Sequence, residues 1–154
     1  MMIVHKAKIV DLEELIRLKL LMFEDAGYSE ILASDANELI LGDYKTLYQD
    51  NKVQHFIIKK DGKIVAMVGA FIKSDLPYCY YKIPYYGFIG DVYTVKKYRG
   101  NGFATLLTNH ALEWLTSKDI GTIRLLASKD ASKLYEKFGF KTSDEMYLDL
   151  KDRQ

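Results

Sequence analysis

The most informative stretch of the chain, residues 89–115, reads IGDVYTVKKYRGNGFATLLTNHALEWL. Ile89 to Val95 is predicted to form a β-strand, and the residues from Phe103 onward repeat apolar side chains at helical spacing. Gly100 and Gly102 stand in the turn between them. Glycine lets a backbone approach a ligand closely, and the first amides of a helix carry partial positive charge. The pattern predicts a phosphate-binding turn or only a tight turn, and the glycines alone do not separate the two.

Two familiar phosphate motifs do not fit this turn. A Walker A loop ends in Gly-Lys-Ser/Thr, whereas the chain has Gly102, Phe103 and Ala104 there. A dinucleotide-binding fingerprint requires a small residue where Thr105 stands and an acidic residue at the end of the next strand, where Ser128 lies. Both motifs are therefore excluded.

The elements around this stretch predict one α/β domain that spans residues 1–154 and has a mixed α+β sheet. Asp61 and Gly62 mark a hairpin between two strands. Pro77 and Pro84 demote residues 76–88, which are rich in tyrosine, to an edge strand or a loop. Strands are expected at 3–10, 53–60, 63–73, 89–95, 121–126 and 145–150, and helices at 12–26, 35–48, 103–115 and 130–138.

Composition excludes several classes of protein. The 154 residues have 49% apolar and 28% charged side chains with a net charge of +1, so neither disorder nor a broad basic surface for nucleic acid is expected. The single cysteine, Cys79, excludes an internal disulfide, and His5, His55 and His110 form no metal motif. No apolar run is long enough for a membrane span, and charge comes too early for a signal peptide. We expect a cytoplasmic protein without a metal.

The segment from Val92 to Ala104 resembles the acetyl-CoA signature of the GNAT superfamily of N-acetyltransferases. Its core pattern, Arg/Gln-x-x-Gly-x-Gly/Ala, is met by Arg99, Gly102 and Ala104. Residues 134–140, which read LYEKFGF, are similar to the second block of the same family. The order of elements matches over essentially the whole chain. The resemblance implies a GNAT-like acyl-CoA N-acyltransferase fold, in which helices flank a central, mostly antiparallel sheet.

The resemblance also implies which residues bind acetyl-CoA as co-substrate. The strand would hold the pantetheine arm and polarise the thioester carbonyl, the turn would hold the pyrophosphate, and Tyr135 would lie near the sulfur as general acid. Without the resemblance, Tyr135 would be interpreted as a core tyrosine. Ser128 replaces the usual asparagine and Lys96 the usual proline. The residues expected at the co-substrate are Val92, Tyr93, Thr94, Arg99, Gly100, Asn101, Gly102, Phe103, Ala104, Thr105, Ser128 and Tyr135.

Transfer to an amine also requires that a proton be removed from the acceptor. A lysine-like amine with a pKa of about 10.4 costs roughly 5 kcal/mol to deprotonate at pH 7, so a general base or a water relay is expected. The candidate bases are Asp91, on the strand, and Glu24, near the end of the first long helix. For each, a plain surface or capping carboxylate is the alternative interpretation.

Three hypotheses follow from these patterns. The first is an enzyme that moves the acetyl group of acetyl-CoA to a primary amine, on a small molecule or a peptide, by direct attack in a ternary complex. The second is a module of the same fold that senses acyl-CoA without turnover. The third is an interaction protein that uses the aromatic segment Tyr78 to Phe88, which would otherwise line the acceptor site. No nucleic-acid or membrane partner is expected, and a homodimer is left open.

Overall fold

The computed structural model describes residues 2–74 and 83–153. Five strands form one sheet in the order β1-β2-β3-β4-β5, and every neighbouring pair is antiparallel except β4 with β5. The strands are β1 (Val4–Lys6), β2 (Val53–Lys60), β3 (Lys63–Ser74), β4 (Tyr85–Thr94) and β5 (Ile123–Leu125). The α-helices are α1 (Leu12–Asp25), α2 (Ala36–Gln49), α3 (Phe103–Thr116) and α4 (Ser132–Lys137). Short 3-10 turns are η1 (Ile9–Asp11), η2 (Ser29–Ile31), η3 (Lys96–Tyr98) and η4 (Leu150–Arg153).

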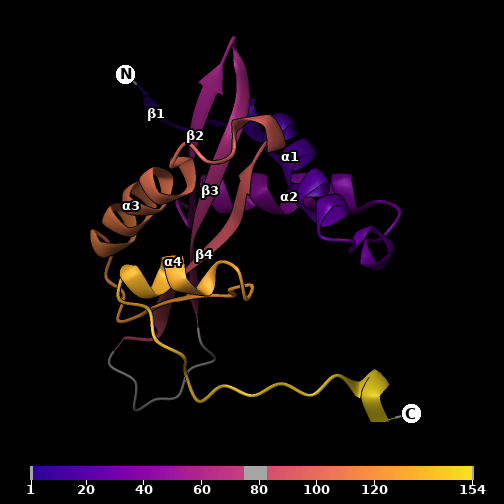
Figure 1. The fold of residues 1–154 in the computed structure, drawn as a ribbon, viewed down its shortest axis with the longest axis vertical. Coiled ribbons are helices and arrows are strands. Elements are labelled where there is room, and N and C mark those ends of the chain that lie inside the picture. Colours follow the sequence, from indigo (N-terminus) through magenta and orange to yellow (C-terminus); the bar gives the residue numbers. More distant parts are fainter. Residues whose placement is uncertain (1, 75–82, 154) are drawn as a thin grey trace.

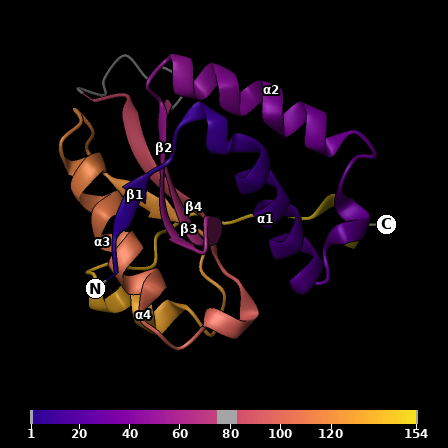
Figure 2. The ribbon, with the colours of Figure 1, turned by 90° about the horizontal axis from the view of Figure 1, so that it is seen from above.

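The sheet lies between two helical layers, with α1 and α2 on one face and α3 and α4 on the other (Figures 1 and 2). Each face has its own core, one built with α3 and one built with α1 and α2. Strand β3 contributes to both, since its residues from Ile64 to Ala70 are all buried. The fold class predicted from the sequence is therefore confirmed, and so is the prediction of a strand buried on both faces.

Two predicted strand boundaries are wrong. The first strand ends at Lys6 because the Asp11 carboxylate accepts a hydrogen bond from the Lys8 amide (2.8 Å) and the chain turns into η1. The fourth strand already begins at Tyr85, so it includes the end of the segment for which the prolines predicted an edge strand or a loop. Pro84 precedes the first strand residue, so the sheet needs no amide hydrogen from it. Pro77, Cys79 and the tyrosines up to position 81 lie outside the described residues.

The strand predicted at 145–150 is absent. These residues belong to an extended tail that runs away from the sheet and ends in η4 (Figure 1). The side chains of Met146 and Tyr147 are 92% and 93% exposed. The apolar pattern is that of a strand, but a strand also needs a neighbour for its backbone hydrogen bonds, and none of the described strands lies beside this tail. Within residues 2–74 and 83–153, no helix is long and apolar enough to cross a bilayer.

Candidate active site

The open feature of the sheet is the second half of β4. Strand β5 pairs only with Gly87 to Ile89, whereas β4 continues to Thr94, so Gly90 to Thr94 have no described strand on that side. The Val95 amide donates to the Val65 carbonyl of β3 (2.8 Å). Because backbone polar groups alternate in direction along a strand, those of Thr94 face the open side. This edge therefore offers backbone hydrogen-bonding groups to a ligand.

A β-bulge interrupts β4 where the open edge begins. Gly90 is opposite Gly69 and Tyr93 is opposite Met67, so two residues of β4, Asp91 and Val92, oppose one residue of β3. Asp91 has a φ of +52°, a left-handed conformation that is usually taken by glycine at such a bulge. The extra residue changes which side chains point to which face of the sheet.

The turn after β4 is shaped by glycines and by the start of α3. Gly100 has a φ of +82°, and Gly102, the residue before α3, has a φ of +74°. A Cβ added at either glycine would have no atom within 4 Å, so the surface above the turn is open. The first amide that bonds within the helix is that of Leu106, to the Gly102 carbonyl (3.1 Å). The earlier amides of α3 are thus available to an anion, which the helix dipole also favours.

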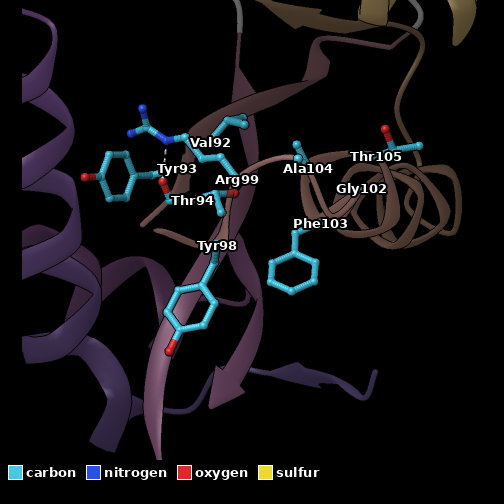
Figure 3. Close-up of a pocket in the computed structure, with 10 residues that line it drawn as sticks. Val92, Tyr93, Thr94, Tyr98, Arg99, Gly102, Phe103, Ala104 and Thr105 are labelled. Atoms are coloured by element: carbon cyan, nitrogen blue, oxygen red, sulfur yellow. Dashed lines mark hydrogen bonds between the residues drawn. The ribbon is translucent and has the colours of Figure 1, made fainter. Parts of the chain in front are cut away.

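The edge of β4 and this turn enclose one pocket of about 330 Å³ (Figure 3). Thr94 and Arg99 are joined across it, because the Arg99 Nε donates to the Thr94 carbonyl (2.9 Å). Tyr93 points toward α1, away from Ala104 and Thr105 at the start of α3. The pocket is lined by Val92, Tyr93, Thr94, Tyr98, Arg99, Gly100, Gly102, Phe103, Ala104 and Thr105. The structure therefore brings together most of the residues that the sequence predicts at the co-substrate.

Asp25, at the end of α1, is a carboxylate beside this pocket that the sequence did not single out. Its Oδ2 accepts hydrogen bonds from the Tyr93 hydroxyl (2.7 Å) and from the Arg99 Nη2 (3.1 Å). The hydrogen bond from Tyr93 lowers the pKa of Asp25 and outweighs its slight burial, and Arg99 lowers it further. Asp25 thus joins the end of α1 to two pocket residues.

Three predicted co-substrate residues lie outside the residues that line the pocket: Asn101, Ser128 and Tyr135. The side-chain amide of Asn101 donates to the Tyr98 carbonyl (2.8 Å) and so braces the turn. The Ser128 carbonyl accepts the amides of Ala131 (3.1 Å) and Ser132 (3.0 Å), so its backbone supports the start of α4.

Tyr135 is a buried residue of α4, with 6% of its surface exposed. Its ring meets that of Phe140 edge to face, with 5.9 Å between the centroids. Burial raises the pKa of its hydroxyl, so the group holds its proton at neutral pH. The side chain is therefore a protonated donor embedded in apolar packing.

Asp91 lies in a surrounding that differs from the sequence expectation of a carboxylate facing the acceptor. Only 6% of the residue is exposed, and its oxygens accept hydrogen bonds from Lys19, Tyr44 and the His55 Nε2 (2.8 Å to the last). The other ring nitrogen of His55 shares a hydrogen bond with the Tyr48 hydroxyl (2.8 Å). We call these five residues the Asp91 cluster.

Electrostatics keep the Asp91 carboxylate ionised. Burial by itself would raise the pKa of Asp91, but the hydrogen bonds and electrostatic attraction of His55 and Lys19 outweigh it and lower the pKa. Burial, together with the nearby carboxylate, raises the pKa of the Tyr44 hydroxyl. Asp91 is thus a hydrogen-bonded anion rather than a carboxylate ready to take up a proton.

Glu24, the other carboxylate predicted as base, is exposed, and its side chain makes no hydrogen bond or ion pair with the described residues. It stands next to Asp25 on the last turn of α1. No group of His, Cys, Asp and Glu within residues 2–74 and 83–153 is arranged to hold a metal ion.

Sequence reasoning missed the partners of Asp91, although one signal was present. Lys19 falls on the apolar stripe of α1 together with Leu15 and Ile16, and a cation on a buried stripe implies a buried partner. Tyr44 and His55 gave no comparable signal, because they belong to α2 and β2 and meet Asp91 only in the folded chain.

Comparison with known proteins places this geometry in a recognised group. Residues 17–140 match the Acetyltransferase (GNAT) family. A predicted acetyltransferase from Clostridium acetobutylicum, solved with acetyl-CoA, is 26% identical with a TM-score of 0.85, over 99% of this chain and 98% of that chain. A GCN5-related N-acetyltransferase from Ralstonia eutropha JMP134 is 22% identical with a TM-score of 0.82, over 97% and 98% of the two chains. Glucosamine-6-phosphate N-acetyltransferase from Arabidopsis thaliana shares the fold at 18% identity and a TM-score of 0.70, over 97% of each chain. No curated protein matches the sequence.

Proposed function

Because the chain belongs to the acetyltransferase (GNAT) family, we propose that it transfers the acetyl group of acetyl-CoA to a primary amine. The observation that carries the proposal is the pocket in which the open edge of β4 meets the glycine turn and the start of α3. The Clostridium acetobutylicum protein, which is similar over nearly its whole length, was solved with acetyl-CoA.

The residues of the pocket fit the chemistry of this co-substrate. The amides at the start of α3 suit a pyrophosphate, and the two glycines leave room for it to approach the backbone. The backbone groups of Val92 to Thr94 would pair with the amides of the pantetheine arm, as a neighbouring strand would. Arg99, which already bonds to Thr94, would keep that edge in place.

The bound co-substrate supplies the acetyl group as a thioester. A backbone amide of β4 would donate to the thioester carbonyl and stabilise the charge that develops there. The acceptor nitrogen attacks that carbon directly in a ternary complex, so that a C–N bond forms and the C–S bond breaks. Tyr135, which is protonated at neutral pH, would give its proton to the leaving thiolate, and burial, which raises its pKa, makes this assistance modest.

The acceptor nitrogen must also lose a proton, at a cost of roughly 5 kcal/mol at pH 7 for a lysine-like amine. Of the two carboxylates predicted for this role, Asp91 has a lowered pKa and three hydrogen-bond donors, which makes it a weak base. Glu24 is exposed, and the proton would pass to it or to water. The acceptor would be a small molecule or a peptide with a free amine.

One observation favours a second candidate function, an acyl-CoA-binding module without turnover. Tyr135 does not line the pocket. The carboxylate that lies beside the pocket, Asp25, has a pKa that is lowered by Tyr93 and Arg99. A site that binds the co-substrate but lacks a proton acceptor would sense acyl-CoA rather than use it.

Calorimetric titration of the folded protein with acetyl-CoA, with CoA alone as the comparison, tests the shared premise. We expect binding in the micromolar range for both compounds. Release of free thiol in the presence of a panel of amines then separates the enzyme from the sensor. Absence of acetyl-CoA binding by a folded protein would overturn both candidates.

A further inference from the structure

We propose that the Asp91 cluster is a positioning device, which holds the β4 bulge and thereby aims the backbone groups of Val92 and Thr94 into the pocket. This role adds to the proposed function and rests on it for the catalytic consequence. The structural part of the proposal, control of the direction of these backbone groups, can be tested without any ligand.

The bulge decides which face each site residue presents. Ile89 belongs to the core on the α3 side, and strict alternation would send Tyr93 to that same side. Instead, Tyr93 belongs to the core of α1 and α2, while Val92 packs toward α3. A shift of one residue reverses every side chain of a strand, so the bulge is what brings Tyr93 to Asp25.

The side chain of Asp91, the bulge residue with the least favourable backbone conformation, holds the backbone of the bulge in place. Asp91 has the left-handed φ that a residue with a Cβ adopts only at some cost. Its carboxylate is bonded by side chains from three separate elements, Lys19 of α1, Tyr44 of α2 and His55 of β2. These bonds form only while Asp91 points between the helices and the sheet, so they select the bulged register.

The chain contains a matched control for this residue. Asp61 has a φ of +51°, nearly that of Asp91, and it also lies at an irregular point of the sheet, the turn between β2 and β3. Asp61 is exposed and lies apart from the pocket of β4 and α3. Substitutions at Asp61 therefore carry the backbone cost of a substitution at Asp91 without the loss of a buried carboxylate.

The test compares Asp91→Asn, Asp91→Gly and Asp91→Ala with the same three substitutions at Asp61. The amide signals of Val92, Tyr93 and Thr94 are followed by nuclear magnetic resonance in the protein without ligand. We expect all folded Asp91 variants to shift these signals, and the Asp61 variants to leave them unchanged. Glycine is the decisive substitution, because it accepts a positive φ freely, so the variant loses the side chain without adding backbone strain. Unchanged signals in folded Asp91→Gly would overturn the proposal.

A second measurement follows the catalytic consequence. For Asp91→Asn we expect kcat to fall at least tenfold while the dissociation constant of acetyl-CoA stays within threefold of the original. The carbonyl stretching frequency of bound acetyl-CoA labelled with ¹³C at the carbonyl should move toward its value in water. If Asp91→Asn yields less folded protein but leaves the carbonyl stretching frequency and kcat unchanged, the cluster only stabilises the fold, and the proposal is overturned.

The two proposals fail in different ways. If the unsubstituted protein folds but does not bind acetyl-CoA, the proposed function is overturned. The amide signals in the absence of ligand still test the positioning role. If Asp91→Ala does not fold, Lys19→Met supplies a second variant, since Lys19 is partly exposed and its removal leaves the other two donors in place. A folded Lys19→Met with unchanged signals at Val92 to Thr94 counts against the proposal.

Discussion

The glycine turn at the start of α3 and the Asp91 cluster lie at the two ends of the same short segment, but they are built in opposite ways. The turn is contiguous in sequence, open to solvent and made of backbone groups. The cluster is assembled from α1, α2, β2 and β4, is made of side chains, and buries Asp91, Tyr44 and His55 away from solvent. The first offers a surface to an anion, and the second determines how the strand beside that surface is oriented.

Substitutions in the two regions should therefore have different effects. A change in the turn alters contacts with a ligand and costs the fold only the strain of a side chain at positive φ, because nothing packs on the glycines. A change in the cluster leaves a buried polar group without a partner, so it acts on stability and on the geometry of β4.

Gly102→Glu should weaken acetyl-CoA binding by at least about 100-fold, because it places a negative charge against the pyrophosphate. Gly62→Glu is the matched control, since Gly62 has a similar φ of +76° and an equally open surface in the turn between β2 and β3. Calorimetry on both variants measures the effect. Equal affinities in the two variants would remove the phosphate site from the turn.

Tyr135→Phe should lower turnover about tenfold and leave acetyl-CoA affinity nearly intact, because only the proton donor is lost. Steady-state kinetics and calorimetry give the two quantities. Tyr28→Phe serves as the control, since Tyr28 is an exposed tyrosine after α1. Unchanged turnover in Tyr135→Phe would leave this residue with a packing role only.

Tyr44→Phe should lower the free energy of unfolding by about 1 kcal/mol, because Asp91 loses one of its buried donors and the ring is retained. Urea denaturation measures the change. Asp25→Asn, which alters an exposed pair with Arg99 at the rim of the pocket, should not shift the urea midpoint measurably. A similar loss in both variants would contradict the contrast between a closed cluster and an open surface.

Acid should weaken the Asp91 cluster. The pKa of Asp91 is lowered in the folded state from an ordinary value of 3.8, so its contribution to stability is complete above that pH and is lost as the pH falls below it. Unfolding in urea at pH 7, 4 and 3 should show this loss in the original chain. Asp91→Asn should show a smaller loss. If the free energy of unfolding falls equally with pH in both proteins, other groups cause the acid sensitivity.

The parts of the fold and site that sequence could predict are those with local causes. The hairpin at Asp61 and Gly62, the apolar stripe of α3 and the glycine turn each result from residues close together in the chain. The prediction of a strand at 145–150 was wrong because the apolar pattern is local, whereas a strand also needs a neighbouring strand to pair with. The same holds for Tyr85 to Phe88, whose place inside β4 depends on pairing with β3 and β5.

By itself, the sequence determined the mixed α/β class, the family resemblance and the run of backbone amides that could meet a phosphate. Those properties arise from periodicity and from the freedom of glycine, which act over a few residues. Only the tertiary structure decided that Asp91 is a buried anion, that Lys19, Tyr44 and His55 are its partners, and that Asp25 reaches the pocket. Such contacts join residues from separate elements, and they exist only once packing has excluded water and brought those elements together.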